Sequence, residues 1–509
     1  MKLIFIFIFS LISLIFKSDS GIQPKKISEK WFPEPNVEIN TPAFKKKNGF
    51  TKHKEMMLFI ETLRQMHPQK LKIEWIGNSQ KGKGIPLVRI NTSSEKKIKV
   101  WLQGGLHGDE PASTEGLLFL LSEIFKPENA KLLNQFDWAI LPMANVDGYE
   151  IQDRYASNGL DLNRDQTKLM VQESIILKKA LCAFEPDLAL DFHEYRPYRT
   201  DFLEMGVAGL GSAYDVMILN SSNLNIPKNQ REITQNYFVN PLIEQLSAQN
   251  FRVHDYFTTD THLDNLFLSQ GSNSARSSAT SFALTGAIST LFEIRGVGLG
   301  RTSFKRRTYV TYLCAKSYLE SAAKNSELVL ESLKKPSKNN EKVVISTKNS
   351  LFNQQILMVD LFKKDTVSIV LPTKDAKNLK PVIERKTPEF YWIHASQKEI
   401  LERLSWFNLL HDTLTAAKSV SLETYQLQGN CEIDPVKFEG VYRQDCKYKL
   451  VSQTIELPAG TLLFPVNQRK GRILLELLEP DAPNSLVSYS VIKANNFPIL
   501  PYYRSITKQ

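Results

Sequence analysis

Residues 98–110 of the chain read IKVWLQGGLHGDE, and this stretch indicates the class of fold. Its first part is largely apolar, which is typical of a strand buried on both faces in a sheet covered by helices. Two glycines end the strand, and His107 and Glu110 follow, three positions apart. Open α/β sheets place their ligands beyond the ends of such strands. The stretch therefore predicts an α/β fold with a polar site at the edge of its sheet.

The sequence around this stretch continues the alternation of strands and helices. Apolar runs of strand length occur on both sides of it, and amphipathic runs of helical length separate several of them. We predict strands at 71–77, 85–90, 98–105, 137–145, 187–194 and 287–296, and helices at 52–66, 113–125, 171–183 and 305–334. Alternating elements of this kind build an α/β sheet whose two faces are covered.

The length and composition are those of a folded protein with two or three domains. The chain has 509 residues, of which 42% are hydrophobic and 23% charged, and domains usually span about 100–200 residues. The net charge of +10 is spread over short runs such as 45–47 and 305–307. Nucleic-acid-binding proteins usually concentrate basic charge on one face, so we expect no nucleic-acid partner.

The first 20 residues have the pattern of a signal peptide. Lys2 precedes an apolar run over residues 3–16, and Ser18 and Ser20 place small side chains before a cleavage point at Gly21. An uncleaved anchor is the alternative. Beyond this run, no apolar stretch approaches the roughly 20 residues that a membrane span needs. We therefore expect a periplasmic or secreted protein with no membrane span once the signal is removed.

The chain contains four cysteines, and their positions agree with this location. Cys431 and Cys446 are close in sequence and can close a small loop in an oxidising compartment. Cys182 and Cys314 lie in apolar helical patterns, which are typical of thiols in a core. Because the chain has no C-x-x-C motif, a zinc site built from thiolates is not supported.

Composition divides the mature chain into three segments. Residues 21–48 are polar and contain proline, and form a lead-in segment. Residues 49–335 carry the α/β pattern. The polar run KKPSKNNEK at 334–342 is typical of a linker. Beyond it, short strand patterns alternate with turns around a helical pattern at 397–409, so residues 340–509 are predicted to form a smaller α+β domain.

Two histidines and a glutamate are candidate metal ligands. His107 and Glu110 follow one predicted strand, and His193 lies in the motif DFHE at the end of another. Such a set holds a catalytic zinc and leaves its fourth position open to water, which then attacks a carbonyl near neutral pH. The ordinary alternatives are a helix-surface pair for His107 and Glu110 and a hydrogen-bonded core residue for His193.

A further carboxylate and several polar side chains suggest the remaining chemistry. Glu293 ends a hydrophobic strand, where a buried carboxylate is costly without a partner or a role. We expect a general base beside a metal-activated water. The turn-rich stretch 145–165 carries Arg154, Asn163 and Arg164, and arginine is suited to binding carboxylates and polarising carbonyls. A solvated surface loop is the alternative for this stretch.

Taken together, these motifs resemble those of the zinc carboxypeptidase family, the carboxypeptidase A-like metallopeptidases. The match consists of HGDE, NVDG, RYASNGLDLNRD, DFHE and the FE of LFEIRG, in that order, and covers about residues 52–334. The resemblance implies a mixed central sheet flanked by helices and one zinc ion per chain. The stretch FEIRGVGLGR at 292–301 is similar to a bacterial sub-branch whose members often carry a C-terminal domain.

The resemblance also implies a role for each matched residue. It makes His107, Glu110 and His193 the zinc ligands, Glu293 the base, and Arg154 the group that polarises the scissile carbonyl. The resemblance further implies that Asn163 and Arg164 hold the substrate's terminal carboxylate. It also implies that Asp161 orients the first zinc histidine, His107. The family's active-site tyrosine has no match: Tyr256 is the nearest upstream of Glu293, in an unfamiliar context. Arg276, in the same stretch, is more typical of a surface residue.

We therefore expect a zinc metallocarboxypeptidase acting on a peptide or peptide-like substrate with a free carboxylate. A close alternative is a zinc amidase for peptidoglycan stem peptides or other carboxylate-bearing amides, and the expected location is compatible with contact with the cell wall. An alternative from another class is a non-catalytic envelope protein that binds peptides or glycans. The presence of Glu293 argues against that class, because a binding module has no need of a base beside a metal.

Overall fold

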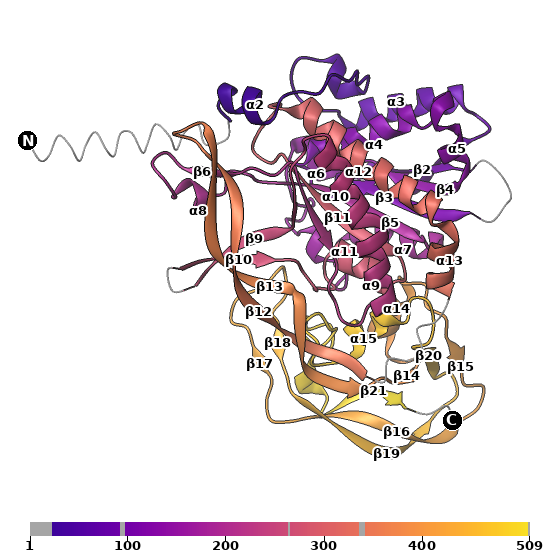
Figure 1. Cartoon of the computed structure of the whole chain (residues 1–509). Coiled ribbons are helices and arrows are strands. Elements are labelled where there is room, and N and C mark those ends of the chain that lie inside the picture. Colours follow the sequence, from indigo (N-terminus) through magenta and orange to yellow (C-terminus); the bar gives the residue numbers. More distant parts are fainter. Residues whose placement is uncertain (1–22, 92–96, 263–264, 335–341, 507–509) are drawn as a thin grey trace, which may run out of the picture.

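An eight-stranded mixed sheet forms the centre of the amino-terminal two thirds of the computed structural model (Figure 1). Its strand order is β1-β2-β4-β3-β5-β11-β7-β8, and β3, β4, β5 and β11 run parallel to their neighbours within this group. The strands are β1 (Leu71–Asn78), β2 (Gly84–Ile90), β3 (Ile98–Gly104), β4 (Phe136–Leu141), β5 (Leu188–Tyr195), β7 (Val216–Asn220), β8 (Val253–Asp255) and β11 (Ile288–Arg295). The α/β fold predicted from the alternating pattern is therefore present.

Helices flank this sheet. Helices α4 and α12 pack against each other. Helix α4 also contacts β5, α12 contacts β11, α7 contacts β1, and α11 contacts β5 and β11. The principal helices are α3 (His53–Met66), α4 (Pro111–Glu123), α7 (Gln172–Phe184), α9 (Lys228–Thr234), α10 (Asn240–Ala248), α11 (Ser278–Leu284), α12 (Phe304–Lys324) and α13 (Ser326–Lys334). The pattern at 305–334, predicted as one helix, forms two helices that meet at Asn325.

The structure describes residues 23–91, 97–262, 265–334 and 342–506. The predicted signal peptide and nearly all of the predicted linker at 334–342 lie outside these residues. Within the lead-in segment, α2 (Lys25–Trp31) precedes Phe32, which packs with Ala213 and Val359. No helix in the described ranges is both long and apolar enough to cross a membrane.

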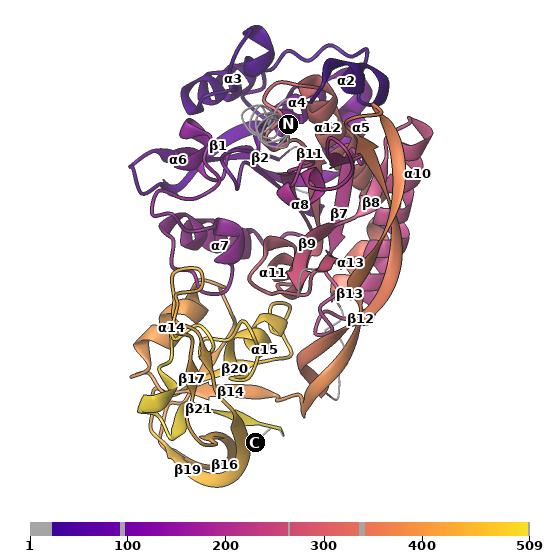
Figure 2. The same cartoon turned by 90° about the vertical axis from the view of Figure 1, so that its left-hand side faces the viewer.

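A long hairpin follows the predicted linker and runs along one side of the molecule (Figures 1 and 2). Its strands β12 (Lys342–Asp360) and β13 (Asp365–Lys386) pair over most of their length. They join a five-stranded sheet of order β6-β12-β13-β10-β9, whose other strands are β6 (Leu210–Ser212), β9 (Phe257–His262) and β10 (Asn265–Gln270). The hairpin thus hydrogen-bonds to strands on the other side of the domain boundary predicted at residue 340.

The remaining chain forms a third sheet at the lower end of the molecule in Figure 1. Its order is β15-β20-β14-β21-β16-β19, with α14 (Lys398–Ser405) and α15 (Arg472–Leu478) beside it. The strands are β14 (Phe390–Ile393), β15 (Asp412–Thr413), β16 (Lys418–Leu427), β19 (Tyr448–Leu457), β20 (Leu462–Pro465) and β21 (Ile499–Ser505). Buried apolar residues of α15 belong to the same cluster as those of the central sheet. The division of the chain at residue 340 remains a prediction.

The four cysteines divide into one bonded pair and two thiols. Cys431 and Cys446 form a disulfide. It borders a small two-stranded sheet made of β17 (Glu432–Ile433) and β18 (Gln444–Asp445). Cys182 and Cys314 are free and buried, as their apolar surroundings in the sequence predict.

Candidate active site

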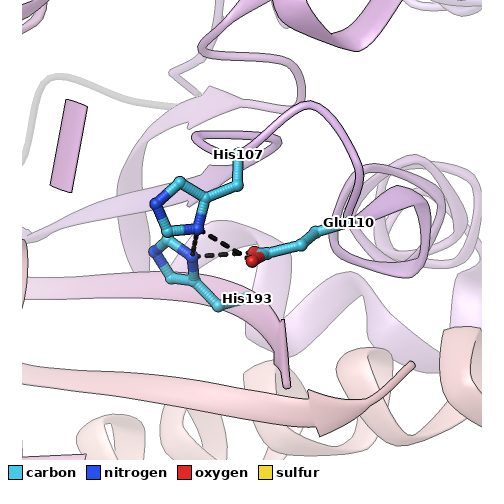
Figure 3. Close-up of side chains that lie close together, drawn as sticks. All are labelled: His107, Glu110 and His193. Carbon is cyan, nitrogen blue, oxygen red and sulfur yellow. Dashed lines mark hydrogen bonds and ion pairs between the residues drawn. The ribbon is translucent and has the colours of Figure 1, made fainter. Parts of the chain in front are cut away.

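His107, Glu110 and His193 converge at the carboxyl ends of β3 and β5 (Figure 3). The Nδ1 atom of His107 lies 2.8 Å from Oε1 of Glu110, and the Nδ1 atom of His193 lies 2.8 Å from Oε2 of the same carboxylate. The two Nδ1 atoms are 3.0 Å apart. All three side chains are buried. The structure thus brings together the three residues predicted as metal ligands.

The loop that carries His107 and Glu110 lies against the backbone of a neighbouring segment. A Cβ atom at Gly108 would collide with the backbone of Gly148 and with the carbonyl oxygen of Asp153. Glycine is therefore required here, because any other residue would push the loop away from the segment that leads to Arg154.

Each histidine has an aspartate oxygen within hydrogen-bond distance of its second ring nitrogen, Nε2. The Nε2 atom of His107 lies 3.0 Å from Oδ1 of Asp161, and the Nε2 atom of His193 lies 3.0 Å from Oδ2 of Asp191. With Nε2 bonded to a carboxylate, the proton sits on that nitrogen and Nδ1 presents its lone pair to the cluster. Asp161 was predicted in this position; Asp191 was not, although it lies two residues before His193 on the same strand and therefore on the same face.

These atoms fit a zinc ion. Two imidazole nitrogens and a carboxylate that share one point, with a carboxylate behind each ring, form a donor set typical of catalytic zinc. Burial alone would lower the pKa of His107, but Glu110 and Asp161 raise it above its ordinary value. The two histidines also hold the pKa of Glu110 far below its usual range, against the effect of burial. The site is thus an anionic cluster suited to a cation.

Glu293 lies beside this cluster. On the paired strands β11 and β5, Glu293 is the register partner of His193, so the two side chains point to the same side of the sheet. Burial, together with the nearby carboxylate of Glu110, raises the pKa of Glu293 to about 7. A carboxylate in such surroundings readily accepts and returns a proton near neutral pH.

Arg154 connects the metal-ligand cluster to the loop that follows α6 (Val146–Ile151). Its Nε and Nη2 atoms donate to Oδ2 of Asp161 at 3.1 and 2.8 Å, and its Nη1 atom lies 3.1 Å from Nδ1 of His107. Asp161 therefore holds both a histidine of the cluster and a guanidinium. This double contact fixes the guanidinium at the edge of the cluster.

A cavity of about 620 Å³ opens beside the metal-ligand cluster. Its polar lining includes three residues predicted for the site and two that had no predicted role, namely Arg154, Asn163, Arg164, Tyr256 and Arg276. Its lining also includes apolar side chains of the central sheet, namely Met217, Leu219 and Leu291. The cavity thus combines apolar side chains with a cationic end, by which we mean the part lined by Arg164 and Arg276.

The cationic end of the cavity is organised by hydrogen bonds. The Oδ1 atom of Asn163 accepts a hydrogen bond of 2.8 Å from the backbone of Ser278, and Arg164 donates to the carbonyl oxygen of Asn163 at 2.8 Å. The sequence favoured a surface position for Arg276, but its side chain lines the cavity. No local pattern indicates this, because Arg276 and Tyr256 approach the site only through the tertiary fold.

Arg295 lies away from the metal-ligand cluster, although it is two residues from Glu293. Its guanidinium stacks on Phe32, with 3.9 Å between Cζ and the ring centroid, and its Nε atom donates to the carbonyl oxygen of Ser212 at 3.2 Å. Its contacts therefore connect β11 to the lead-in segment.

The mixed sheet, and the His–Glu–His cluster with Glu293 beside it in one cavity, are typical of a metal-dependent hydrolase. A family model described as zinc carboxypeptidase matches residues 56–180. Carboxypeptidase 2 of Trichophyton rubrum is 27% identical over 476 residues, which cover 90% of this chain and 87% of that one. Zinc carboxypeptidase A 1 of Anopheles gambiae is 28% identical over 105 residues, which cover 20% of this chain and 24% of that one.

Solved structures with a similar arrangement include a metallo-carboxypeptidase from Burkholderia cenocepacia, 16% identical, which covers 54% of this chain and 70% of its own with a TM-score of 0.42. These similarities support a zinc-dependent metallocarboxypeptidase, and the His107–Glu110–His193 cluster is a site able to hold its metal. The relative from Trichophyton rubrum matches over most of the length of this chain, including most of the region beyond residue 340.

Proposed function

We propose that this protein removes the C-terminal residue of peptides, with Glu293 as the general base. The observation that carries this proposal is that one cavity is lined by His107, Glu293 and Arg164. A peptide whose terminal carboxylate contacts Arg164 would extend toward His107 and Glu293. Its last peptide bond would then reach the reactive groups.

The roles proposed for the chain's own residues follow from their positions. When bound by His107, Glu110 and His193, zinc supplies a Lewis acid that polarises a carbonyl and lowers the pKa of a water. Glu293 accepts a proton from the attacking water and passes it to the amine that leaves. Arg154 donates hydrogen bonds to the carbonyl oxygen as negative charge develops on it.

The substrate's terminal carboxylate is assigned to Asn163 and Arg164. Both residues line the cavity, and the backbone contacts of Asn163 hold them in place. A guanidinium can bind a carboxylate through two parallel hydrogen bonds, which adds geometric selectivity for a free C-terminus. This contact would make the protein an exopeptidase.

We also propose that the protein acts outside the cytoplasm, in the periplasm or as a secreted enzyme. The apolar run at residues 3–16 and the small residues before Gly21 support this location. The bond between Cys431 and Cys446 supports it as well, because disulfides persist in oxidising compartments. In the envelope of a bacterium, peptidoglycan stem peptides would be among the substrates available.

Incubation of the zinc-loaded mature protein with a mixed peptide library, followed by mass spectrometry, tests the reaction. The library includes linear peptides, the same peptides with C-terminal amides, and peptidoglycan stem peptides, each with and without chelator. We expect loss of single C-terminal residues from free-acid peptides and no loss when chelator is present. Absence of cleavage by protein that holds one zinc per chain would contradict the proposal. Cleavage restricted to stem peptides would favour the amidase alternative.

A further inference from the structure

The C-terminal region sends a disulfide-closed hairpin, residues 431–446, to the cationic end of the cavity. Strands β17 and β18 pair within it, and the Cys431–Cys446 bond lies at its base. At its tip, Phe438 and Val441 exchange backbone hydrogen bonds of 2.8 and 3.2 Å. The hairpin thus ends in a two-residue turn made of Glu439 and Gly440.

The turn places a glutamate where the backbone does not favour one. Glu439 has φ 49° and Gly440 has φ 89°. A turn with two positive φ values favours Asn, Asp or Gly at its first position, and a glutamate there is strained. A favourable contact of the Glu439 side chain must offset this cost.

That contact is with three cationic side chains of the catalytic part. Oε1 of Glu439 accepts a hydrogen bond from Nη1 of Arg276 and lies 3.9 Å from Nε of Arg164. Its Oε2 accepts a hydrogen bond of 2.9 Å from Nζ of Lys168, which also donates to the Glu439 carbonyl oxygen at 3.2 Å. Lys168 is buried, with 2% of its side chain exposed. One carboxylate therefore holds three cations together.

The neighbours of Glu439 fix the position of the tip. The ring of Phe438 contacts two guanidinium groups, with its centroid 4.9 Å from Cζ of Arg276 and 5.2 Å from Cζ of Arg443. A Cβ atom at Gly440 would lie 2.9 Å from Cδ2 of Leu160. The tip is therefore packed against the loop that carries Arg154 and Arg164, and the positive φ of Gly440 favours glycine there.

Glu439 contacts these cations from outside the cavity. Among the described residues that line the cavity, Arg164 and Arg276 appear, whereas Glu439 and Lys168 do not. Three cations and one carboxylate also leave a net positive charge at this end of the cavity. The geometry therefore leaves room for a second carboxylate on the side of Arg164 and Arg276 that faces the cavity.

We propose that Glu439 is a positioning residue that orients Arg164 and Arg276 to bind the substrate's terminal carboxylate, and that Arg276 contacts this carboxylate together with Arg164. The C-terminal region then completes the substrate site. This inference rests on the proposed function, because it takes Arg164 to be the group that recognises the carboxylate. The opposite role for Glu439 is to compete with the substrate for Arg164 and Arg276, and it gives the opposite kinetic result.

Steady-state kinetics of the zinc-loaded full chain separate these roles. With a free-acid peptide, Glu439→Gln is expected to raise KM about tenfold, the effect of a weakened charge-assisted contact, while kcat changes less than about twofold. Glu439→Asp keeps the charge and suits the turn, and it should restore most of the affinity. Glu432→Gln makes the same chemical change at an exposed position of the same hairpin and should leave both constants unchanged. An unchanged KM in Glu439→Gln would overturn the proposal, and a lower KM would indicate competition with substrate.

A binding measurement distinguishes failure of this inference from failure of the proposed function. In the zinc-loaded Glu293→Gln protein, calorimetry compares an N-acetylated peptide acid with its C-terminal amide. We expect the acid to bind at least about tenfold more tightly, and Glu439→Gln to reduce this preference below about threefold. If the preference depends on Glu439 but the wild type cleaves no peptide, only the proposed reaction fails. If the wild type cleaves peptides and the preference is absent or independent of Glu439, only this inference fails.

Discussion

Glu293 of β11 and His193 of β5 are register partners on adjacent parallel strands, and their side chains face the same side of the sheet. The central sheet therefore fixes the spacing between the proposed base and a proposed metal ligand without any help from loops. Sites carried on strands are held more precisely than sites on loops. The residues that contact the substrate's carboxylate in our account lie outside these strands, and Glu439 of the C-terminal region orients two of them, so binding preferences can change there while this pair stays fixed.

Asp161 and Asp191, which contact the two histidines, are both expected to affect zinc affinity, but only Asp161 is expected to affect kcat. Asp191 contacts His193 and Gln103, whereas Asp161 contacts His107 and Arg154. We expect Asp191→Asn and Asp161→Asn each to weaken zinc binding about 10–100-fold, because a ligand histidine loses its carboxylate partner. At saturating zinc, only Asp161→Asn should also lower kcat, since it releases Arg154. Competition with a chromophoric chelator measures the affinity. Equal kcat values for the two variants would contradict the separate role of Asp161.

Arg154 and Arg164 are expected to affect different kinetic constants. Arg154 lies beside the metal-ligand cluster, so Arg154→Gln should lower kcat by about 10²–10³-fold, the usual cost of losing a donor to a developing oxyanion. Arg164→Gln should instead raise KM about tenfold or more for free-acid peptides and change kcat little. Arg64→Gln, on the half-exposed face of α3, provides the control. A fall in kcat of the same size in both variants would show that the two assignments are wrong.

Glu115 is expected to make stability depend on pH. Burial raises its pKa to about 7, although Thr41 and Thr51 donate hydrogen bonds to its carboxylate. The folded-state pKa thus lies above the ordinary value of 4.5, so the folded state binds this proton more tightly than the unfolded state. The protonated Glu115 carboxyl therefore stabilises the folded state. This contribution is fully present below about pH 4.5 and is lost as the pH rises through about 7.

Glu115→Gln removes this dependence, because the amide stays neutral. As the pH rises from 5 to 8, the free energy of unfolding of the variant minus that of the wild type should increase by about 2 kcal/mol. Urea unfolding of both proteins at the two pH values measures the difference, and Glu128→Gln, at an exposed position, serves as the control. A difference that does not change with pH would show that Glu115 is ionised in the folded protein across this range.

The sequence predicted the parts of the site that follow strand ends. The runs before His107, His193 and Glu293 are apolar and of strand length, so hydrophobic periodicity located them. The order of those strands in the sheet did not follow from periodicity, because it depends on pairings between distant segments. Asp191 lies two residues before His193 on the same predicted strand, and this spacing is the signal that could have identified it.

Tyr256, Arg276 and Glu439 were not predicted as site residues, because they reach the site through contacts between distant parts of the chain. Tyr256 and Arg276 lie in a stretch where no strand or helix was predicted, and β8, β9, β10 and α11 form there. Glu439 belongs to another part of the chain and reaches Arg276 across 163 residues. The hairpin β12–β13 forms where the sequence predicted only short strand patterns between turns, since many of its positions are polar and exposed. Nothing local distinguishes such polar stretches from loops.

Glu293→Gln tests the central claim most directly, because glutamine keeps the size of the side chain and removes its ability to accept the proton. The variant is assayed against a peptide that the wild type cleaves, and its zinc content is measured by mass spectrometry. Glu115→Gln makes the same change at a buried glutamate outside the cavity and should keep wild-type turnover. We predict that Glu293→Gln lowers kcat by at least about 10³-fold and retains one zinc per chain. Turnover close to that of the wild type, in protein shown to hold zinc, would contradict the account.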